Sequence, residues 1–257
     1  MGDKKFYGTV LLKADLILNY LYKASSPQPL STIAEETGLT KSNLSKILET
    51  MEHIGFVARN KTDKMYSLGP KFIKYSSKQL ELYQFNNKVL DEIDDLYNTF
   101  DETVHLGVFQ NDQIITSKKI QSSQSVVCIS SDVGDTKDLY SSAMGKAVLA
   151  EMDDKRLFAY INENNFIAKT DKTIASAKKL LSEVESIRTK GYSIDNEENE
   201  EGVFCIGTAI VKERDEETRE IVGAFSVSLP VYRATEEKVA EIVESLLEAK
   251  QSIQSHL

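Results

Sequence analysis

The chain has 257 residues, which is longer than one typical domain and favours two. Its composition, 41% hydrophobic and 28% charged with four prolines, is that of a globular protein and excludes a long disordered chain. No apolar run approaches the length of a membrane span, and the first residues lack the apolar segment of a signal peptide. We therefore expect a cytoplasmic protein.

Cysteine and histidine are too scarce for a fold that is held together by disulfides or by a bound metal ion. The cysteines, Cys128 and Cys205, cannot build a disulfide framework and suit a reducing compartment. The histidines, His53, His105 and His256, lie far apart, and no Cys or His stands at zinc-site spacing from another. We expect neither a metal nor a cofactor.

The charge is divided unevenly along the chain, whose net value is −9. Residues 1–69 hold nine Lys/Arg against seven Asp/Glu, a net charge of +2, and the remaining residues hold 22 against 33, a net charge of −11. This asymmetry suits a small module that binds a polyanion, joined to a larger acidic domain.

Two short helices are expected at the start of the chain. Apolar side chains recur at helical spacing from Val10 to Leu21, and the prolines of "SSPQP" end that helix. A second helix, "TIAEET", is expected to have Ser31 as its N-cap and to end at Gly38, which fills a left-handed cap position at little cost.

A third helix, which has Thr40 as its N-cap and closes at Gly55, is followed by a hairpin. The apolar face of this helix consists of Leu44, Ile47, Leu48 and Met51. Two short strands, at residues 56–59 and 65–68, follow around a polar tip. This order of elements is that of a winged helix-turn-helix, in which the third helix enters the major groove of DNA.

The polar face of the third helix and the hairpin carry the residues that we expect to bind DNA. Short hydrogen-bonding side chains suit base edges, and Lys and Arg neutralise phosphates. The expected contacts are Thr40, Lys41, Ser42, Asn43, Ser45 and Lys46 on the helix, and Arg59, Lys61 and Lys64 on the hairpin. The alternative is a capped helix with an ordinary solvated face, but the order and lengths of the elements favour DNA binding.

Residues 70–85 predict a linker helix between a domain at 1–69 and a second domain at 86–257, because helical periodicity continues to Tyr83 without Gly or Pro after Pro70. In the second domain, helices are expected at residues 87–100, 142–152, 154–164, 174–190 and 236–254. Strands are expected at residues 104–110, 113–120, 126–130, 203–211 and 221–229, with a tight hairpin at 111–113. Helices packed on a mainly antiparallel sheet make this an α+β protein.

Two of the expected strands have one bulky face and one small face. The small faces consist of Cys205, Gly207 and Ala209 on one strand, and of Ala224, Ser226 and Ser228 on the other. Ile221 is placed on the bulky face with Phe225. Small residues leave room for a cavity lined by short polar groups. They also permit close packing of a helix, so both interpretations stay open.

A helix that begins at Ser141 or Ser142 adds a candidate anion site, because its first N–H groups have no partners within the helix. In the simpler interpretation the serine is only an N-cap. Asp195 is either a turn residue or an acceptor for a ligand hydroxyl. Lys146, one turn into the helix, is the only cation that we expect near this end.

These segments resemble those of a known family. The stretches "PLSTIAEETGLTKSNLSKILETMEHIGFVARN", "DLYSSAMGKAVLAEM", "KGYSIDNEENEEGVFCIGTAI" and "IVGAFSVSLP" are similar, in the same order, to segments of the IclR family of bacterial transcription regulators. The resemblance implies a winged-helix domain that binds operator DNA as a dimer. It also implies a GAF-like effector domain, with an effector pocket between the small strand faces and the start of the helix.

The resulting hypothesis is a ligand-responsive transcription regulator whose effector is a small carboxylate such as a keto acid or sugar acid. The residues expected to line the effector site are Ser141, Ser142, Ala143, Met144, Asp195, Cys205, Ser226 and Ser228. The expected partners are double-stranded operator DNA, the organic acid and further copies of the chain, as a dimer or tetramer. No membrane contact is expected.

Two other functions were weighed against this hypothesis. A metabolite-binding, GAF-like protein whose winged domain contacts other proteins would carry the same motifs. An enzyme would need Cys205 and His105 as nucleophile and base, but no third orienting group stands in a known order. "SAMGKAV" also lacks the first glycine and the Ser/Thr of a phosphate-binding P-loop. We therefore expect no catalytic residues.

Overall fold

The computed structural model describes residues 7–82, 85, 87–124, 131–213 and 219–257. The chain divides into two compact units, Met1–Leu82 and Tyr83–Leu257. Within the described residues, no helix is long and apolar enough to cross a membrane. Cys128 and the strand expected at 126–130 lie outside the described residues.

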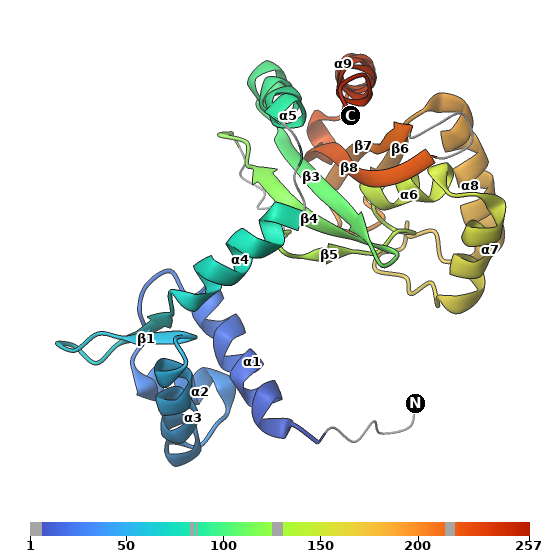
Figure 1. Ribbon diagram of the computed structural model, residues 1–257. Coiled ribbons are helices and arrows are strands. Elements are labelled where there is room, and N and C mark those ends of the chain that lie inside the picture. Colours follow the sequence, from blue (N-terminus) through green and yellow to red (C-terminus); the bar gives the residue numbers. More distant parts are fainter. Residues whose placement is uncertain (1–6, 83–84, 86, 125–130, 214–218) are drawn as a thin grey trace. The chain divides into compact units, whose positions relative to one another are not determined.

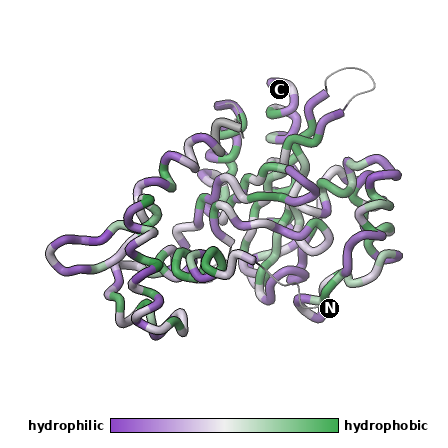
Figure 2. Tube along the Cα trace, turned by 60° about the horizontal axis from the view of Figure 1, so that its bottom comes forward, coloured by the Kyte–Doolittle hydropathy of each residue, from purple (hydrophilic) through white to green (hydrophobic). Residues whose placement is uncertain are grey.

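The first unit is a winged helix-turn-helix, as the sequence predicts (Figure 1). Its elements are α1 (Thr9–Lys23), α2 (Leu30–Thr37), α3 (Lys41–His53), β1 (Val57–Arg59), β2 (Tyr66–Leu68) and α4 (Lys71–Leu82). The strands β1 and β2 pair antiparallel, and Gln28 forms an isolated bridge to Tyr66. The apolar face of α3 is buried in the core of this unit, which leaves the polar face outward. Figure 2 shows the tip of the β1–β2 hairpin as hydrophilic.

The helix caps agree with the sequence at two positions and differ at one. Gly38 has a φ of +67°, and the Oγ1 atom of Thr40 accepts a hydrogen bond from the N–H of Asn43 at 3.4 Å. Ser31 is not an N-cap, because α2 begins two residues earlier than expected, with Pro29 at the cap position. Proline has its φ fixed and has no N–H to satisfy, so the helix starts directly after it.

Helix α1 buries less of its apolar surface than the periodicity of its sequence suggests. Its buried residues are Ile17 and Leu21, both in its second half. Val10 and Leu11, which the sequence places on the same stripe, are 55% and 71% exposed. The first half of α1 therefore presents apolar side chains to solvent.

The second unit is a six-stranded antiparallel sheet with helices on both faces (Figure 1). In spatial order the strands are β5 (Thr136–Lys137), β4 (Gln113–Ile120), β3 (Thr103–Gln110), β8 (Arg219–Pro230), β7 (Val203–Glu213) and β6 (Ser193–Asn196). One core joins the sheet to α5 (Asn87–Phe100) and α9 (Glu236–Gln254). The other core contains α6 (Ala143–Glu151), α7 (Asp154–Glu163) and α8 (Ala177–Lys190). A 3₁₀ turn, Val231–Arg233, precedes α9.

The two faces of β7 and β8 differ as the sequence predicts. Their bulky residues pack against α5 and α9, whereas Ala209 and Ala224 pack on the side of α6. Ile221 was assigned to the wrong face, since it packs with the α6 cluster. A register shift between Ile210 and Val211 explains the error, because a β-bulge reverses the alternation of side chains beyond it.

The small face serves close helix packing as well as a cavity. A Cβ atom on Gly207 would lie 2.9 Å from the backbone carbon of Ala143 and from the backbone nitrogen of Met144. The Oγ of Ser193 donates a hydrogen bond to the carbonyl of Ala143, which holds the start of α6 against the sheet. Glycine at position 207 therefore allows the N-terminus of α6 to touch β7.

Candidate functional site

The expected DNA-binding residues of α3 form one exposed surface. Thr40, Lys41, Ser42, Ser45 and Lys46 are exposed, whereas Asn43 is partly buried. The side chains of Asn43 and Lys46 also line a groove of about 360 Å³ between α1 and α3. The apolar wall of this groove includes Val10 and Leu11 from α1.

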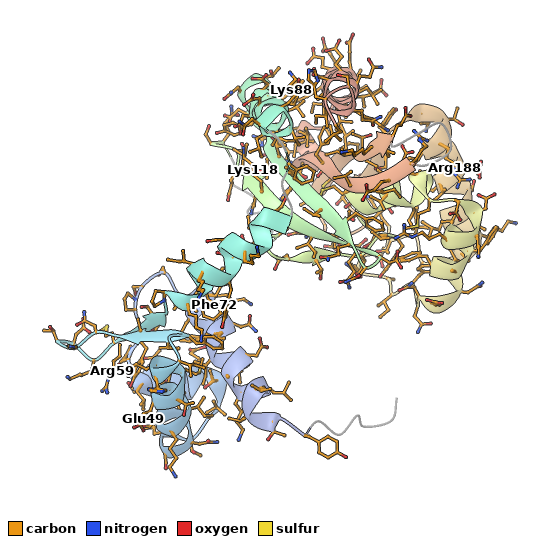
Figure 3. All side chains as sticks on the ribbon, viewed as in Figure 1. Glu49, Arg59, Phe72, Lys88, Lys118 and Arg188 are labelled. Atoms are coloured by element: carbon orange, nitrogen blue, oxygen red, sulfur yellow. The ribbon has the colours of Figure 1, made fainter. Side chains whose placement is uncertain are left out.

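The hairpin holds its cations in defined positions. The guanidinium of Arg59 lies 5.2 Å from the centre of the Tyr66 ring, a cation–π contact that fixes its direction. The Nζ of Lys64 donates to the carbonyl of Lys61 at 2.7 Å, and Lys64 has a φ of +62° at the hairpin tip. Lys61 is exposed. Both Arg59, which is labelled in Figure 3, and Lys64 are therefore held by contacts within the hairpin.

The outer face of α3 also carries acidic side chains. Glu49 is exposed and lies one helical turn beyond Ser45 and Lys46 (Figure 3). A carboxylate on this face is repelled by phosphates but can accept a hydrogen bond from the amino group of cytosine. The positive charge of α3 is therefore concentrated at its N-terminal half, at Lys41 and Lys46.

A cavity lies between the sheet and the N-terminus of α6. Strand pairing sets two rows of side chains across its wall, since Ser228 pairs with Cys205 and Cys205 with Asp195. In the second row, His105 pairs with Ser226. Both rows belong to the face of small residues, so short polar groups gather where α6 begins.

Helix α6 points its N-terminus into this cavity. The Oγ of its N-cap, Ser142, accepts a hydrogen bond from the N–H of Gly145 at 3.1 Å. The N–H groups of Ala143 and Met144, at the first two helical positions, have no acceptor within the helix. Both residues line the cavity, which gives it two backbone donors and the positive end of the helix dipole.

All but one of the residues expected at the effector site line this cavity. They are Ser142, Ala143, Met144, Asp195, Cys205, Ser226 and Ser228. Ser141 does not line it, because its side chain is buried beside the helix start and its Oγ lies 3.5 Å from the Oδ1 of Asn199.

Sequence reasoning missed six lining residues, namely His105, Ser131, Lys137, Asn199, Glu200 and Val203. One signal was present, since the polar His105 and the small Gly107 alternate with the aliphatic Val104 and Leu106. Lys137 gave no signal because β5 is only two residues long.

The cavity has a volume of about 40 Å³, which is room for a few water molecules. Pockets that enclose drug-sized ligands measure about 300–1,000 Å³. The cavity in the described conformation is therefore too small for a drug-sized ligand.

His105 is a neutral hydrogen-bonding group of the cavity wall. Its Nε2 lies 2.8 Å from the Oγ of Ser131, and its Nδ1 lies 3.4 Å from the Oγ of Ser228. Burial lowers the pKa of His105 to about 3, and the charges of Lys137 and Lys119 act in the same direction. The ring therefore stays uncharged at neutral pH.

Asp195 is held by the loop that follows β6. Its Oδ1 accepts hydrogen bonds from the N–H of Glu198 at 2.7 Å and of Asn199 at 3.3 Å. Burial nevertheless raises the pKa of Asp195 to about 6, although these bonds and the charge of Lys146 oppose the rise. A ligand hydroxyl near Asp195 meets an acceptor at neutral pH.

Lys146, the cation that the sequence places nearest to the start of α6, does not line the cavity. Its side chain is fully buried, and its Nζ binds Glu198 and the carbonyl of Ile194. Glu183 lies 3.7 Å away on the other side. Burial raises the pKa of Glu198 to about 7 against the attraction of Lys146. Lys146 therefore ties α6 to the loop after β6.

The cavity lacks the features of a catalytic dyad. Burial raises the pKa of the Cys205 thiol above its usual range, so the thiolate is scarce at neutral pH. The ring of His105 is hydrogen-bonded to Ser131 and Ser228, and its low pKa makes it a poor base. Among the described residues, no group of three or more His, Cys, Asp or Glu is placed to hold a metal ion.

Both units match the models of one protein family. Residues 77–255 match the bacterial transcriptional regulator IclR C-terminal domain, and residues 10–61 match the IclR helix-turn-helix domain. The chain is 28% identical over 228 residues to the HTH-type transcriptional regulator KdgR of Escherichia coli strain K12, which covers 89% of this chain and 85% of that protein.

Solved structures agree with these matches. The crystal structure of the Thermotoga maritima IclR is similar with a TM-score of 0.81 and 35% identity, over 97% of this chain and 98% of that one. An IclR homologue from Microbacterium hydrocarbonoxydans, crystallised in complex with 4-hydroxybenzoate, has the same fold, with a TM-score of 0.71 and 18% identity over 96% and 98% of the two chains.

The neutral His105 makes the stability of the second unit sensitive to acid. Between the ordinary pKa of 6.5 and the folded value of about 3, the unfolded chain binds a proton that the folded protein does not bind. Stability from this residue is present above pH 6.5 and is lost as the pH falls. From pH 7 to pH 5 the loss should be about 2 kcal/mol.

Urea denaturation of the wild type and of His105→Gln at the two pH values measures this effect. The free energy of unfolding of the variant should fall by about 2 kcal/mol less than that of the wild type. His256→Gln, at an exposed histidine of the same unit, is the control and should follow the wild type. Equal losses in the wild type and in His105→Gln would contradict a neutral, buried ring.

The buried pair of Lys146 and Glu198 should show strong coupling. Lys146→Met leaves the Glu198 carboxyl buried without its cation, which should cost about 3–5 kcal/mol of folding free energy. The double variant Lys146→Met/Glu198→Gln should recover most of this loss, because no charge then stays buried. Denaturation of the two single variants and the double variant gives the coupling energy, and additive losses would show that the pair does not interact.

Proposed function

Because the chain belongs to the IclR family and is a DNA-binding transcription regulator with a ligand-binding C-terminal domain, not an enzyme, we propose that a small carboxylate controls how its dimer binds operator DNA. The observation that carries the proposal is the meeting of short polar side chains with the N-terminus of α6 in one cavity. The regulator acts where its operator is, in the cytoplasm.

Operator binding is assigned to α3 and the β1–β2 hairpin. The N-terminal half of α3 offers Ser42, Asn43 and Ser45 to base edges and Lys41 and Lys46 to phosphates. Arg59, Lys61 and Lys64 lie on the hairpin, where a wing follows the backbone of the DNA. Thr40, as the N-cap, sets the direction in which α3 enters the groove.

The proposed oligomer is at least a dimer, in which a second copy covers the exposed half of α1. Val10, Leu11, Leu12 and Leu16 are all exposed large apolar residues, and so many neighbouring ones on one helix of a soluble unit favour burial by a partner. A two-fold dimer presents two α3 helices to the half-sites of a (pseudo)palindromic operator.

The proposed effector is a small acid, such as a keto acid or a sugar acid, with a hydroxyl or oxo group. A carboxylate suits the free N–H groups of Ala143 and Met144. Ser226, Ser228 and Asp195 then face the hydroxyl or oxo group. The 4-hydroxybenzoate of the M. hydrocarbonoxydans homologue has both kinds of group, which supports the proposal at the level of the shared fold.

Substitutions on the DNA-binding surface should weaken or redirect operator binding. Lys46→Ala and Arg59→Ala each remove one phosphate contact, so each should reduce the slope of log affinity against log salt by about 1. Asn43→Ala should change the preferred operator sequence, since a base contact discriminates by about 1–3 kcal/mol. The measurement is gel-shift titration at several salt concentrations, on genomic fragments selected by the purified protein.

The control for this experiment is Lys178→Ala, which removes an exposed cation of α8. Its affinity and salt slope should equal those of the wild type. Unchanged binding in all three surface variants, or an affinity that is independent of salt, would refute the DNA interface and favour a winged domain that contacts protein.

Substitutions in the cavity should weaken the binding of the acid. They should leave the affinity of the ligand-free protein for DNA unchanged. Ser226→Ala, Ser228→Ala and Asp195→Asn should each lower the affinity for the acid about tenfold, because each removes a hydrogen bond from a buried ligand. Cys205→Ser should leave ligand-free DNA binding intact. Thermal-shift screening of small organic acids, sugar acids and neutral aromatics would find the ligand.

The matched control is Ser182→Ala, at an exposed position of α8. It should bind the acid like the wild type. A protein stabilised only by neutral apolar compounds, or acid binding that none of the three cavity variants weakens, would refute the proposed effector class.

A further inference from the structure

Lys137 is a cation of the cavity wall that the proposed function leaves unexplained. It lies on β5, which is the edge strand beside β4, and its half-buried side chain lines the cavity. Across the described ranges, 7–82, 85, 87–124, 131–213 and 219–257, its ammonium has no hydrogen-bond or ion-pair partner.

The other lysines around the cavity are engaged. Lys146 binds Glu198, Lys169 binds Asp138 at 2.8 Å, and Lys119 lies 3.7 Å from Asp132. Removing an ammonium from water without an opposite charge in contact is unfavourable. The pKa of Lys137 accordingly falls below its ordinary value through burial, although the charges of Asp135 and Glu200 oppose the fall.

The charge of Lys137 acts on the centre of the cavity. The positive charge of Lys137 acts to lower the pKa of His105, on β3, and of Asp195, on the far edge strand β6. At Asp195 this effect opposes the larger rise that burial causes. The cavity holds only about 40 Å³, so groups that line it lie within reach of one small ligand. Lys137 and the N-terminus of α6 therefore face the same few atoms.

We propose that Lys137 binds the carboxylate of the effector together with the N–H groups of Ala143 and Met144, and so makes the cavity selective for an acid over its neutral amide. The inference rests on the proposed function, in which the effector is a small acid. One carboxylate oxygen accepts from the helix N-terminus and the other from the ammonium, a charge-assisted bond.

The acidic side chains of the cavity favour one orientation of the ligand. Asp195 and Glu200 repel a second negative charge, whereas Asp195 accepts a hydrogen bond from a hydroxyl. The preferred effector is thus a monoanion with its carboxylate at Lys137 and its hydroxyl or oxo group toward the row of Ser228, Cys205 and Asp195.

The test compares acids with their amides on the full-length protein. The probes are lactate and lactamide, pyruvate and pyruvamide, and 4-hydroxybenzoate and 4-hydroxybenzamide, titrated by calorimetry and thermal shift at neutral pH. The wild type should bind at least one acid tenfold or more tightly than its amide. In Lys137→Met this preference should fall to less than threefold, through loss of affinity for the acid and not for the amide.

Two further variants keep the test independent of folding. Lys137→Gln removes the same charge and retains polarity, and it should behave like Lys137→Met. Lys178→Met removes an exposed lysine of α8 and should keep the full preference of the wild type. The thermal midpoints without ligand show whether each variant is folded.

The remaining outcomes separate this inference from the proposed function. If acids bind and the preference survives in both Lys137 variants, the role of Lys137 is refuted while the acid effector stands. If affinity for acid and amide falls equally, Lys137 shapes the cavity without binding the carboxylate, which also refutes the inference. If no acid binds the wild type, the proposed effector class is wrong and the inference fails with it.

Discussion

The contact between the N-terminus of α6 and β7 at Gly207 is the constraint on which the effector unit depends. A side chain at 207 would collide with the backbone of Ala143 and Met144, so only glycine lets the helix start on the sheet. Gly145, in the first turn of α6, allows the segment before the helix to pass close by, because a Cβ there would lie 2.4 Å from the Cα of Leu139. The helix terminus, whose first N–H groups have no acceptor within the helix, is thereby fixed over the rows of small polar side chains. The bulky residues of β7 and β8 fill the opposite core, and they make the sheet a rigid support for the cavity.

Buried charge connects the cavity to the body of the unit. Lys146, in the second turn of α6, binds Glu198, and the N–H of Glu198 donates to Asp195 on the cavity wall. The loop after β6 therefore touches both the helix and the cavity, through adjacent groups of one hydrogen-bonded network. A displacement of Asp195 also moves the partner of a fully buried lysine, and such a network has few arrangements in which every charge is satisfied. This favours distinct conformations of the loop over gradual deformation.

The small volume of the cavity bears on the proposed regulation by a ligand. A ligand shifts an equilibrium between two conformations only by its different affinity for them. Because about 40 Å³ does not hold an organic acid, the proposed effector would act by favouring a form in which the cavity is larger. By linkage, the factor by which a bound effector changes the affinity for operator DNA equals the factor by which bound DNA changes the affinity for the effector.

The sequence by itself determined the two folds, most of their helices and strands, and seven of the residues that line the cavity, because these depend on local signals. Thr40 as an N-cap follows from its short side-chain oxygen, and the alternation on β7 and β8 and the helix at 143–151 follow from periods of two and 3.6 residues. Only the tertiary structure decided which charged side chains are buried against a partner and which line the cavity. The sequence points to Lys146 and gives no signal for Lys137, yet Lys146 is buried against Glu198 and Lys137 lines the cavity, since strand order and helix approach set their surroundings. The bulge that moves Ile221 to the other face and the two-residue strand β5 likewise arise from pairing between distant segments, which no local period encodes.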